Sequence, residues 1–168
     1  MKLIFFDTEF SGLIINPRLI SVGLVSEDGR EFYAEMPDTY RIDQCSQFVQ
    51  EAVLPLLHGG DAIMTLPELT LRLGNWLEGF DEPIKLAMDS LSWDWPWINK
   101  IFCEPYTWPE NLDGKPLILI QSDDFNLAVE NAFAGGLRRH HALDDAKANR
   151  LGWLAAAPKA IMINENGY

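Results

Sequence analysis

Residues 1–10, MKLIFFDTEF, decide the fold of this chain. The run LIFF at 3–6 is apolar without interruption, which is typical of a strand covered on both faces and hence of a central strand in an α/β sheet. Two acids, Asp7 and Glu9, follow directly. Because strand side chains alternate between faces, both carboxylates are expected to point the same way from a rigid element.

The rest of the chain supplies further strands and helices around this run. Apolar runs predict strands at 19–26, 30–36, 84–88 and 116–120, the first two joined as a hairpin by a tight turn at Glu27-Asp28-Gly29. Helical spacing predicts helices over 43–57 (with Pro55 as an early stop or kink), 66–79, 94–103 and 142–156, and a further helix that runs to about 133 after Ser122 and Asp123 as its caps. This order predicts an α/β layered fold, a mixed sheet with helices on its faces. With no internal repeat or linker, we expect one domain over 1–168.

Composition and charge restrict the classes of protein and of function to which this chain can belong. The chain has 168 residues, 48% of them hydrophobic, which is a globular composition. Its net charge of −12 argues against a large sequence-independent grip on duplex nucleic acid, but leaves room for a small site where bound cations meet a phosphate. No apolar stretch is long enough for a membrane span or signal peptide. Cys45 and Cys103 lie far apart without a CxxC motif, so we expect reduced, buried thiols in a cytoplasmic protein.

An acid also falls on the apolar face of a predicted helix. A helix that starts at Asp94 has an apolar stripe made of Trp97, Ile98 and Ile101. At about 100° per residue, Asp94 projects into that stripe. A carboxylate directed at the core is unfavourable unless it is paired or binds a metal, although Asp is also a common helix N-cap. Asp89, directly after the preceding strand, is the competing candidate, and the helix-face argument favours Asp94.

The segment HHALDDA, which begins at His140, contains two histidines and two acids. The predicted helix carries an apolar stripe of Ala142, Ala146, Trp153 and Ala156. Asn149 is a polar exception on it. Asp145 lies about 60° from the stripe's centre and is expected to face inward, whereas Asp144 points nearly opposite and is expected to be solvated. Helical spacing pairs His141 with Asp145, while His140 reaches Asp145 only from a loop before the helix.

Three of these segments together resemble the motifs of the DEDDh superfamily of 3′→5′ exonucleases. They are DTE at 7–9, WD at 93–94 and HHALDD at 140–145. In that superfamily the histidine stands five residues before the last aspartate, which selects His140 and Asp145. The second motif departs from the pattern, because the Asn that commonly precedes the aromatic-Asp pair is missing from DSLSWD at 89–94. Both Asp94 and Asp89 therefore remain candidates at that position.

The resemblance implies a fold and a catalytic apparatus. The fold is RNase-H-like, a mixed five-stranded sheet flanked by helices. Asp7, Glu9, Asp94 and Asp145 would bind two divalent cations, Mg²⁺ with Mn²⁺ as a substitute, since both ions prefer oxygen ligands. Asp7 would bridge the two cations, Glu9 and Asp145 would hold the one that carries the attacking water, and Asp94 would serve the other. His140 would take the proton from that water.

The resemblance also implies a substrate. The DTEF start, the DGREFYAEM hairpin and the compact length are most similar to the RNase-T-like 3′-exoribonuclease branch. We therefore expect single-stranded 3′ ends as substrate, RNA in preference to DNA, nucleoside 5′-monophosphates as products, and a homodimer. Thr8 and Phe10 are expected to contact the terminal nucleotide. Arg138 and Arg139 either contact a phosphate or form a solvated basic pair. The alternatives are an RNase-H-like endonuclease, a non-catalytic nucleic-acid-binding module and a hydrolase of small nucleotides.

Overall fold

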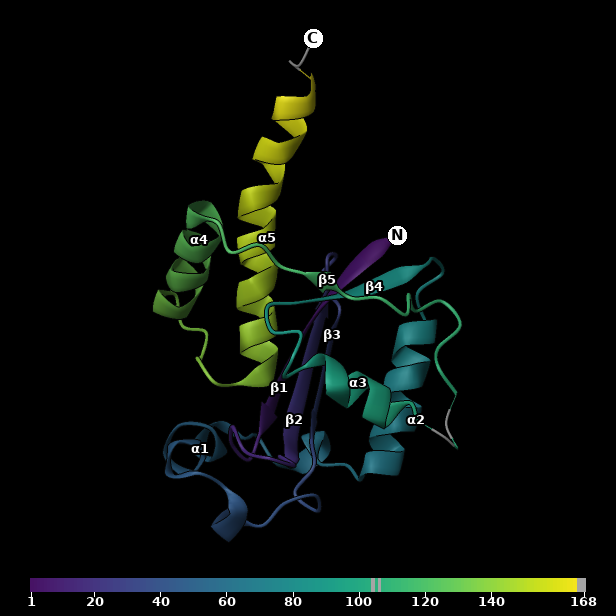
Figure 1. Ribbon diagram of the computed structural model, residues 1–168, viewed down its shortest axis with the longest axis vertical. Helices are drawn as coiled ribbons and strands as arrows, with labels where there is room; N and C mark the ends of the chain where they lie inside the picture. The colour runs from purple at the N-terminus through teal and green to yellow at the C-terminus, as the bar shows by residue number, and fades with distance from the viewer. Residues whose placement is uncertain (104, 106, 166–168) are drawn as a thin grey trace.

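A mixed five-stranded sheet in the order β3-β2-β1-β4-β5 forms the centre of the protein (Figure 1). The computed structural model describes residues 1–103, 105 and 107–165, and of 157–165 it describes only the backbone. The β1–β2 and β2–β3 pairs are antiparallel, and the β1–β4 and β4–β5 pairs are parallel. The strands are β1 (Lys2–Phe10), β2 (Leu19–Ser26), β3 (Glu31–Glu35), β4 (Ile84–Met88) and β5 (Leu117–Ile118). The predicted α/β class and the RNase-H-like topology are confirmed.

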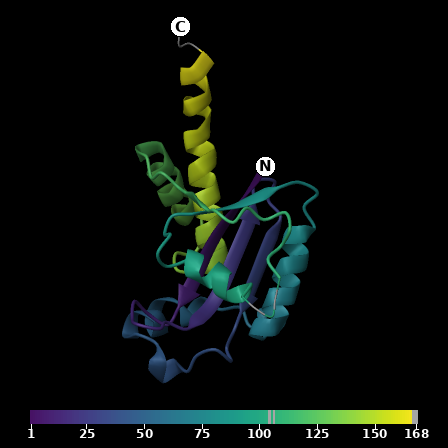
Figure 2. The same ribbon diagram turned by 45° about the vertical axis from the view of Figure 1, so that its right-hand side comes forward.

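Helices cover both faces of this sheet, as Figure 2 shows. They are α1 (Gln47–Ala52), α2 (Leu66–Glu78), α3 (Trp95–Ile101), α4 (Asp123–Ala134) and α5 (Ala142–Glu165). On one face, Ile4 and Phe6 of β1 belong to a core shared with α2 and α3. On the other face, Phe5 packs with residues of α4 and α5. All three side chains are fully buried, so the central strand predicted from LIFF is confirmed.

Several element boundaries differ from those predicted. β1 continues to Phe10, so Asp7 and Glu9 belong to the strand itself. The helix expected over 43–57 is interrupted, because Ser46 caps a new start and Pro55 falls in a separate 3₁₀ turn. β5 pairs with β4 at two positions only, and α5 continues past 156 to Glu165. Cys45 is buried as predicted, but the same prediction was wrong for Cys103, which is exposed just beyond the end of α3.

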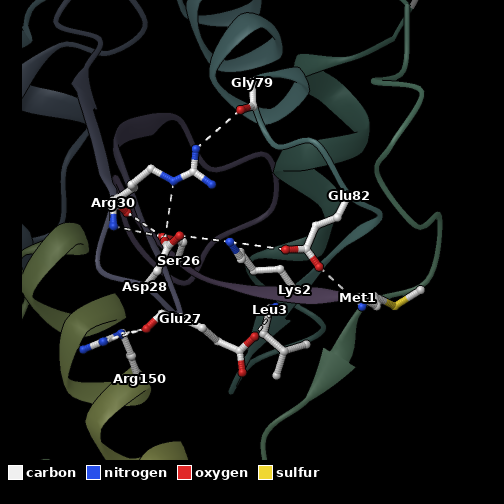
Figure 3. A network of polar contacts seen from close by, with 10 residues as sticks. All are labelled: Met1, Lys2, Leu3, Ser26, Glu27, Asp28, Arg30, Gly79, Glu82 and Arg150. Atoms are coloured by element: carbon white, nitrogen blue, oxygen red, sulfur yellow. Dashed lines mark hydrogen bonds and ion pairs between the residues drawn. The ribbon is translucent and has the colours of Figure 1, made fainter.

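The turn between β2 and β3 fastens three parts of the fold together (Figure 3). Gly29 has the positive φ, 89°, that the predicted hairpin requires. Asp28 accepts hydrogen bonds from Ser26 and from Lys2 of β1. On the other side, the guanidinium of Arg150 in α5 donates to the Glu27 carbonyl at 2.6 and 3.0 Å. The hairpin thus fixes α5 along the sheet. Among the described helices, none is long and apolar enough to cross a bilayer.

Candidate active site

A cavity of about 480 Å³ opens beside the end of β1. Its walls come from β1, from the segment between β4 and α3, from α4, and from the start of α5. The five residues predicted to be catalytic all line it: Asp7, Glu9, Asp94, His140 and Asp145. Segments that are far apart in the sequence therefore meet at one place.

The ionisable side chains in this cavity form two groups. Asp7 lies with Asp89 and Asp94, and within this group one carboxylate oxygen from each residue lies within 4.8 Å of the others. Glu9 lies with His140 and Asp145 under the same distance limit. Because Asp7 and Glu9 are two residues apart on one strand, they point to the same face and start neighbouring groups. Five carboxylates and one imidazole form a donor set that suits hard divalent cations such as Mg²⁺ and Mn²⁺.

Asp94 is held by β1 rather than by its own helix. It is 3% exposed, and its Oδ1 accepts hydrogen bonds from the Thr8 backbone N–H at 3.1 Å and the Thr8 hydroxyl at 2.6 Å. Asp94 occupies the N-cap position of α3, as the alternative expected, but its side chain makes no capping hydrogen bond there. The inward orientation predicted from the helix face is confirmed. Thr8, expected to contact the substrate, directs its backbone N–H and hydroxyl to Asp94.

The structure brings both candidates for the second motif to the cavity. Asp89 lies in the same group as Asp94, at the more exposed edge. Desolvation raises the pKa of Asp89, and its hydrogen bond with Asn149 opposes that rise. Asn149 is 5% exposed and lines the cavity from α5. Sequence reasoning treated Asn149 only as an exception on an apolar stripe. Its position one helical turn after Asp145 was the available signal.

His140 occupies a strained position immediately before α5. Its φ is 68°, in the left-handed region that a residue other than glycine rarely adopts. Its backbone N–H donates to Asp145 Oδ2 at 2.8 Å, and its ring lies within reach of Glu9 and Asp145. The ring of Phe48 meets the imidazole edge-on at 4.9 Å between centroids. His140 thus lies on a loop before the helix. The sequence analysis predicted that His140 could reach Asp145 only from such a loop.

His141 points away from the cavity, into the protein. It is 1% exposed, and its ring stacks on Tyr33 at 4.6 Å and lies 4.7 Å from the ring of His58. Burial and then the nearby Arg138 lower the pKa of His141 to about 4, so it is neutral near pH 7. The pairing of His141 with Asp145 that helical spacing suggested is therefore not observed.

The expectation that Asp144 is solvated was wrong. Asp144 is 5% exposed and accepts hydrogen bonds from the Arg138 backbone N–H at 3.0 Å and from Arg138 Nε at 2.7 Å. Burial acts to raise the pKa of Asp144, but these bonds lower it overall. The prediction assumed one buried helix face, whereas the first turn of α5 rests on β2 and is also covered by Arg138. More than one side of this turn is therefore covered.

The two adjacent arginines have separate environments. Arg138 is in the ion pair with Asp144, and its Nη1 lies 2.9 Å from His58 Nε2, outside the cavity wall. Arg139 lines the cavity, donates to both oxygens of Glu130 at 2.9 Å, and lies 4.1 Å from the centroid of the Phe133 ring. Of the expected basic pair, only Arg139 therefore faces the carboxylates.

Aromatic rings form one apolar wall of the cavity. Phe10 stacks on Trp93 with 5.5 Å between centroids and 17° between planes, and both residues line the cavity. Trp93 is 39% exposed. Trp95 instead packs against Trp108, and Trp97 is buried in the core as predicted. A half-exposed stack beside clustered carboxylates offers a flat surface to a nucleotide base.

The carboxylates strongly perturb one another. Burial, followed by repulsion from Asp94 and Glu9, raises the pKa of Asp7 well above its ordinary value. Burial and then Asp145 raise the pKa of Glu9 to about 8. Burial is also the largest cause of the rise in the pKa of both Asp94 and Asp145 to about 7. At neutral pH these acids must therefore share protons or be neutralised by cations.

His140 has the opposite shift. Partial burial, and then the positive charge of Arg139, lower its pKa below the ordinary value of 6.5. Near pH 7 its imidazole is therefore mostly neutral and able to accept a proton.

Gly23 allows α5 to approach this site. It pairs with Asp7 across β1 and β2. A Cβ atom on Gly23 would lie 2.2 Å from the backbone nitrogen of Leu143 and 2.3 Å from the carbonyl carbon of Ala142. The first turn of α5 therefore rests directly on β2, next to the strand position that carries Asp7. Sequence reasoning missed this residue, although a glycine inside an apolar strand signals the close approach of another backbone.

No protein-family model matches this sequence, and no curated protein matches it significantly.

Proposed function

We propose that this protein is a metal-dependent 3′→5′ exonuclease that releases nucleoside 5′-monophosphates from single-stranded 3′ ends. One observation carries the proposal. Asp7 and Glu9 of one strand each begin a group of ligand atoms, and acids from two other segments complete those groups in a single cavity. The order of these residues, and the five-residue spacing between His140 and Asp145, resemble those of the exonuclease motifs, although the Asn of the second motif is missing. The preference for RNA over DNA rests on the resemblance to the RNase-T-like branch.

The two groups suit two divalent cations. Asp7, Asp89 and Asp94 would hold one, and Glu9 and Asp145 the other. When bound, such a pair of cations activates water and stabilises the charge that develops on the leaving oxygen. The protein's own part is to fix the carboxylates. Thr8 holds Asp94, and the His140 backbone N–H holds Asp145.

His140 is the proton acceptor in this proposal. Its lowered pKa keeps the ring mostly neutral at pH 7, and one of its ring nitrogens lies within 4.8 Å of a carboxylate oxygen of Glu9 and of Asp145. The left-handed backbone conformation, the bond to Asp145 and the contact with Phe48 orient the ring. His140 therefore stands where it can take a proton from water attacking a phosphodiester held at the carboxylates.

Phe10 and Trp93 would bind the base of the terminal nucleotide by stacking. Their stack forms an apolar wall beside the acids, and aromatic faces accept any base because every base has a π face. Arg139 stands on the same cavity and can contact a phosphate if it leaves Glu130. A paired 3′ end would first have to be unstacked, which favours single strands.

The test is digestion of a 5′-labelled single-stranded oligoribonucleotide, and of the same sequence as DNA, in Mg²⁺ and in EDTA. We expect shortening in one-nucleotide steps from the 3′ end in Mg²⁺ and none in EDTA. Asp7→Ala should abolish cleavage, whereas Glu78→Ala, at an exposed acid on α2, should not. Internal cuts would indicate an endonuclease, and binding without cleavage a non-catalytic module. Faster digestion of the DNA than of the RNA would overturn only the proposed preference for RNA, not the proposed exonuclease activity.

A further inference from the structure

A second cavity adjoins the carboxylate cavity. It has a volume of about 510 Å³ and lies between the segment at 16–18 and the start of α3. Trp93 lines both cavities, so the two meet at this ring. A strand whose last nucleotide occupies the first cavity can therefore pass Trp93 into the second.

Two basic side chains line this second cavity. Arg18 and Lys100 are both exposed, and neither makes an ion pair with an acid in the described part of the chain. Most other arginines here are engaged, as Arg138 and Arg139 are with Asp144 and Glu130. In a chain with 25 acids against 13 bases, two neighbouring cations without an acidic partner in the described residues are a distinct feature of this cavity.

The backbone that carries Arg18 is firmly anchored although its side chain is not. Its N–H donates to the hydroxyl of buried Ser11 at 2.9 Å, and its carbonyl accepts from the Ser11 N–H at 2.8 Å. Lys100 lies on α3, with its ammonium 4.9 Å from the centroid of the Trp97 ring. Arg18 is hydrogen-bonded to Ser11, which directly follows β1, and Lys100 lies on α3, which directly follows Asp94. Both charges are therefore positioned by elements that also position the acids.

We propose that this second cavity binds a backbone phosphate of the strand upstream of the 3′-terminal nucleotide, with Arg18 and Lys100 as its cationic partners. The inference rests on the proposed function, since it takes the strand to end at the carboxylates. Phosphate is the group that two free cations recognise, and Trp93 supplies a face against which a neighbouring base can stack.

The same geometry limits how far the strand is held. Beyond Lys100, a third cavity is lined by Arg18 and Lys100 but also by the exposed acid Asp38. A carboxylate repels a phosphate, so the favourable path ends there. The enzyme should therefore grip only the last few nucleotides, in keeping with its overall negative charge.

The experiment compares Arg18→Ala, Lys100→Ala and the double variant on two substrates. One is a single-stranded RNA 12-mer, and the other is an RNA dinucleotide without terminal phosphates, whose only phosphodiester is the scissile one. For the 12-mer we expect KM to rise about fivefold in each single variant at unchanged kcat, as for an exposed ion pair. The dinucleotide should be cleaved at the unaltered rate. Arg72→Ala, at an exposed base on α2, is the matched control.

Salt titration and direct binding complete the test. The salt slope for 12-mer binding should fall by roughly 0.7 for each cation removed. An unchanged KM for the 12-mer, or an equal loss on the dinucleotide, would overturn the proposal. If the unaltered protein cleaves neither substrate, the exonuclease function fails and binding of a fluorescent 12-mer decides the phosphate site. Weaker binding by the double variant supports it, and equal or absent binding overturns it.

Discussion

Asp7 on β1 and Gly23 on β2 are paired across the sheet, and α5 begins directly above Gly23. This relationship makes the position of Asp145 and His140 depend on the absence of a side chain at residue 23. The contact is between backbones, so a flexible side chain cannot give way to relieve a clash.

Gly23→Ala should therefore damage both stability and activity. The new methyl group would push against the backbone of Leu143 and Ala142, and overpacking of this kind destabilises by about 1–3 kcal/mol. We expect a lower melting temperature and a loss of cleavage that added Mg²⁺ does not rescue. Gly74→Ala in α2 is the control, because a Cβ there meets only Phe102 at 3.7 Å. A fully active Gly23→Ala protein would contradict the close approach.

The two adjacent histidines should behave differently. His140→Ala should lower the rate by about 10²–10⁴-fold, the range for loss of a general base, with little change in melting temperature. His141→Ala should mainly lower the melting temperature, because it removes a buried ring stacked on Tyr33. Steady-state kinetics and thermal unfolding of both variants test this. A larger loss of rate in His141→Ala would show that the roles are reversed.

The metal-free protein should lose stability as pH rises. The folded-state pKa of Glu9 is about 8 against an ordinary value of 4.5, so between these values the folded state binds more protons than the unfolded state. Stability therefore decreases with pH across this window in EDTA. Mg²⁺ binds the ionised carboxylates and should restore it.

Asp7→Asn offers the matched comparison for this pH dependence. It removes one buried charge from the cluster, so in EDTA near pH 8 it should melt at a higher temperature than the unaltered protein. It should also gain less stability from Mg²⁺. Melting curves at pH 5.5 and 8.5 provide the measurement. A metal-free protein that is more stable at the higher pH would rule out the cluster as the cause.

Asp94 and Asp89 should contribute unequally to the proposed activity. Asp94→Asn should be nearly inactive, because Asp94 is buried and fixed by two hydrogen bonds from Thr8. Asp89→Asn should retain activity but need more Mg²⁺ to reach half its maximal rate, because this acid lies at the exposed edge of the same group. Mg²⁺ titration of the rate tests both variants. The opposite ranking would make Asp89 the principal ligand.

Local periodicity was enough to predict the direction in which three of the carboxylate side chains point. Alternation along β1 placed Asp7 and Glu9 on one face, and the helix face of α3 directed Asp94 inward. Periodicity did not decide between His140 and His141, because that depends on where α5 begins. The left-handed conformation of His140 determines this start, and it leaves no pattern in the sequence.

The remaining differences arise from contacts between distant segments. Asp144 was expected in solvent because one helix face was assumed to be buried, yet it is buried against Arg138. Arg18 and Lys100 line the same cavity only because α3 lies next to the segment at 16–18 that follows β1. No local pattern in the sequence predicts either of these long-range arrangements.

The attachment of α5 to the hairpin through Arg150 and Glu27, together with its contact at Gly23, has a consequence for partly folded molecules. A molecule with an intact sheet but an undocked α5 would keep Asp7, Glu9 and Thr8 in place and still lack Asp145 and His140. Such a species would be a folded but inert protein. If α5 detaches on heating before the sheet melts, the proposed cleavage should cease at that lower temperature, while the sheet is still folded.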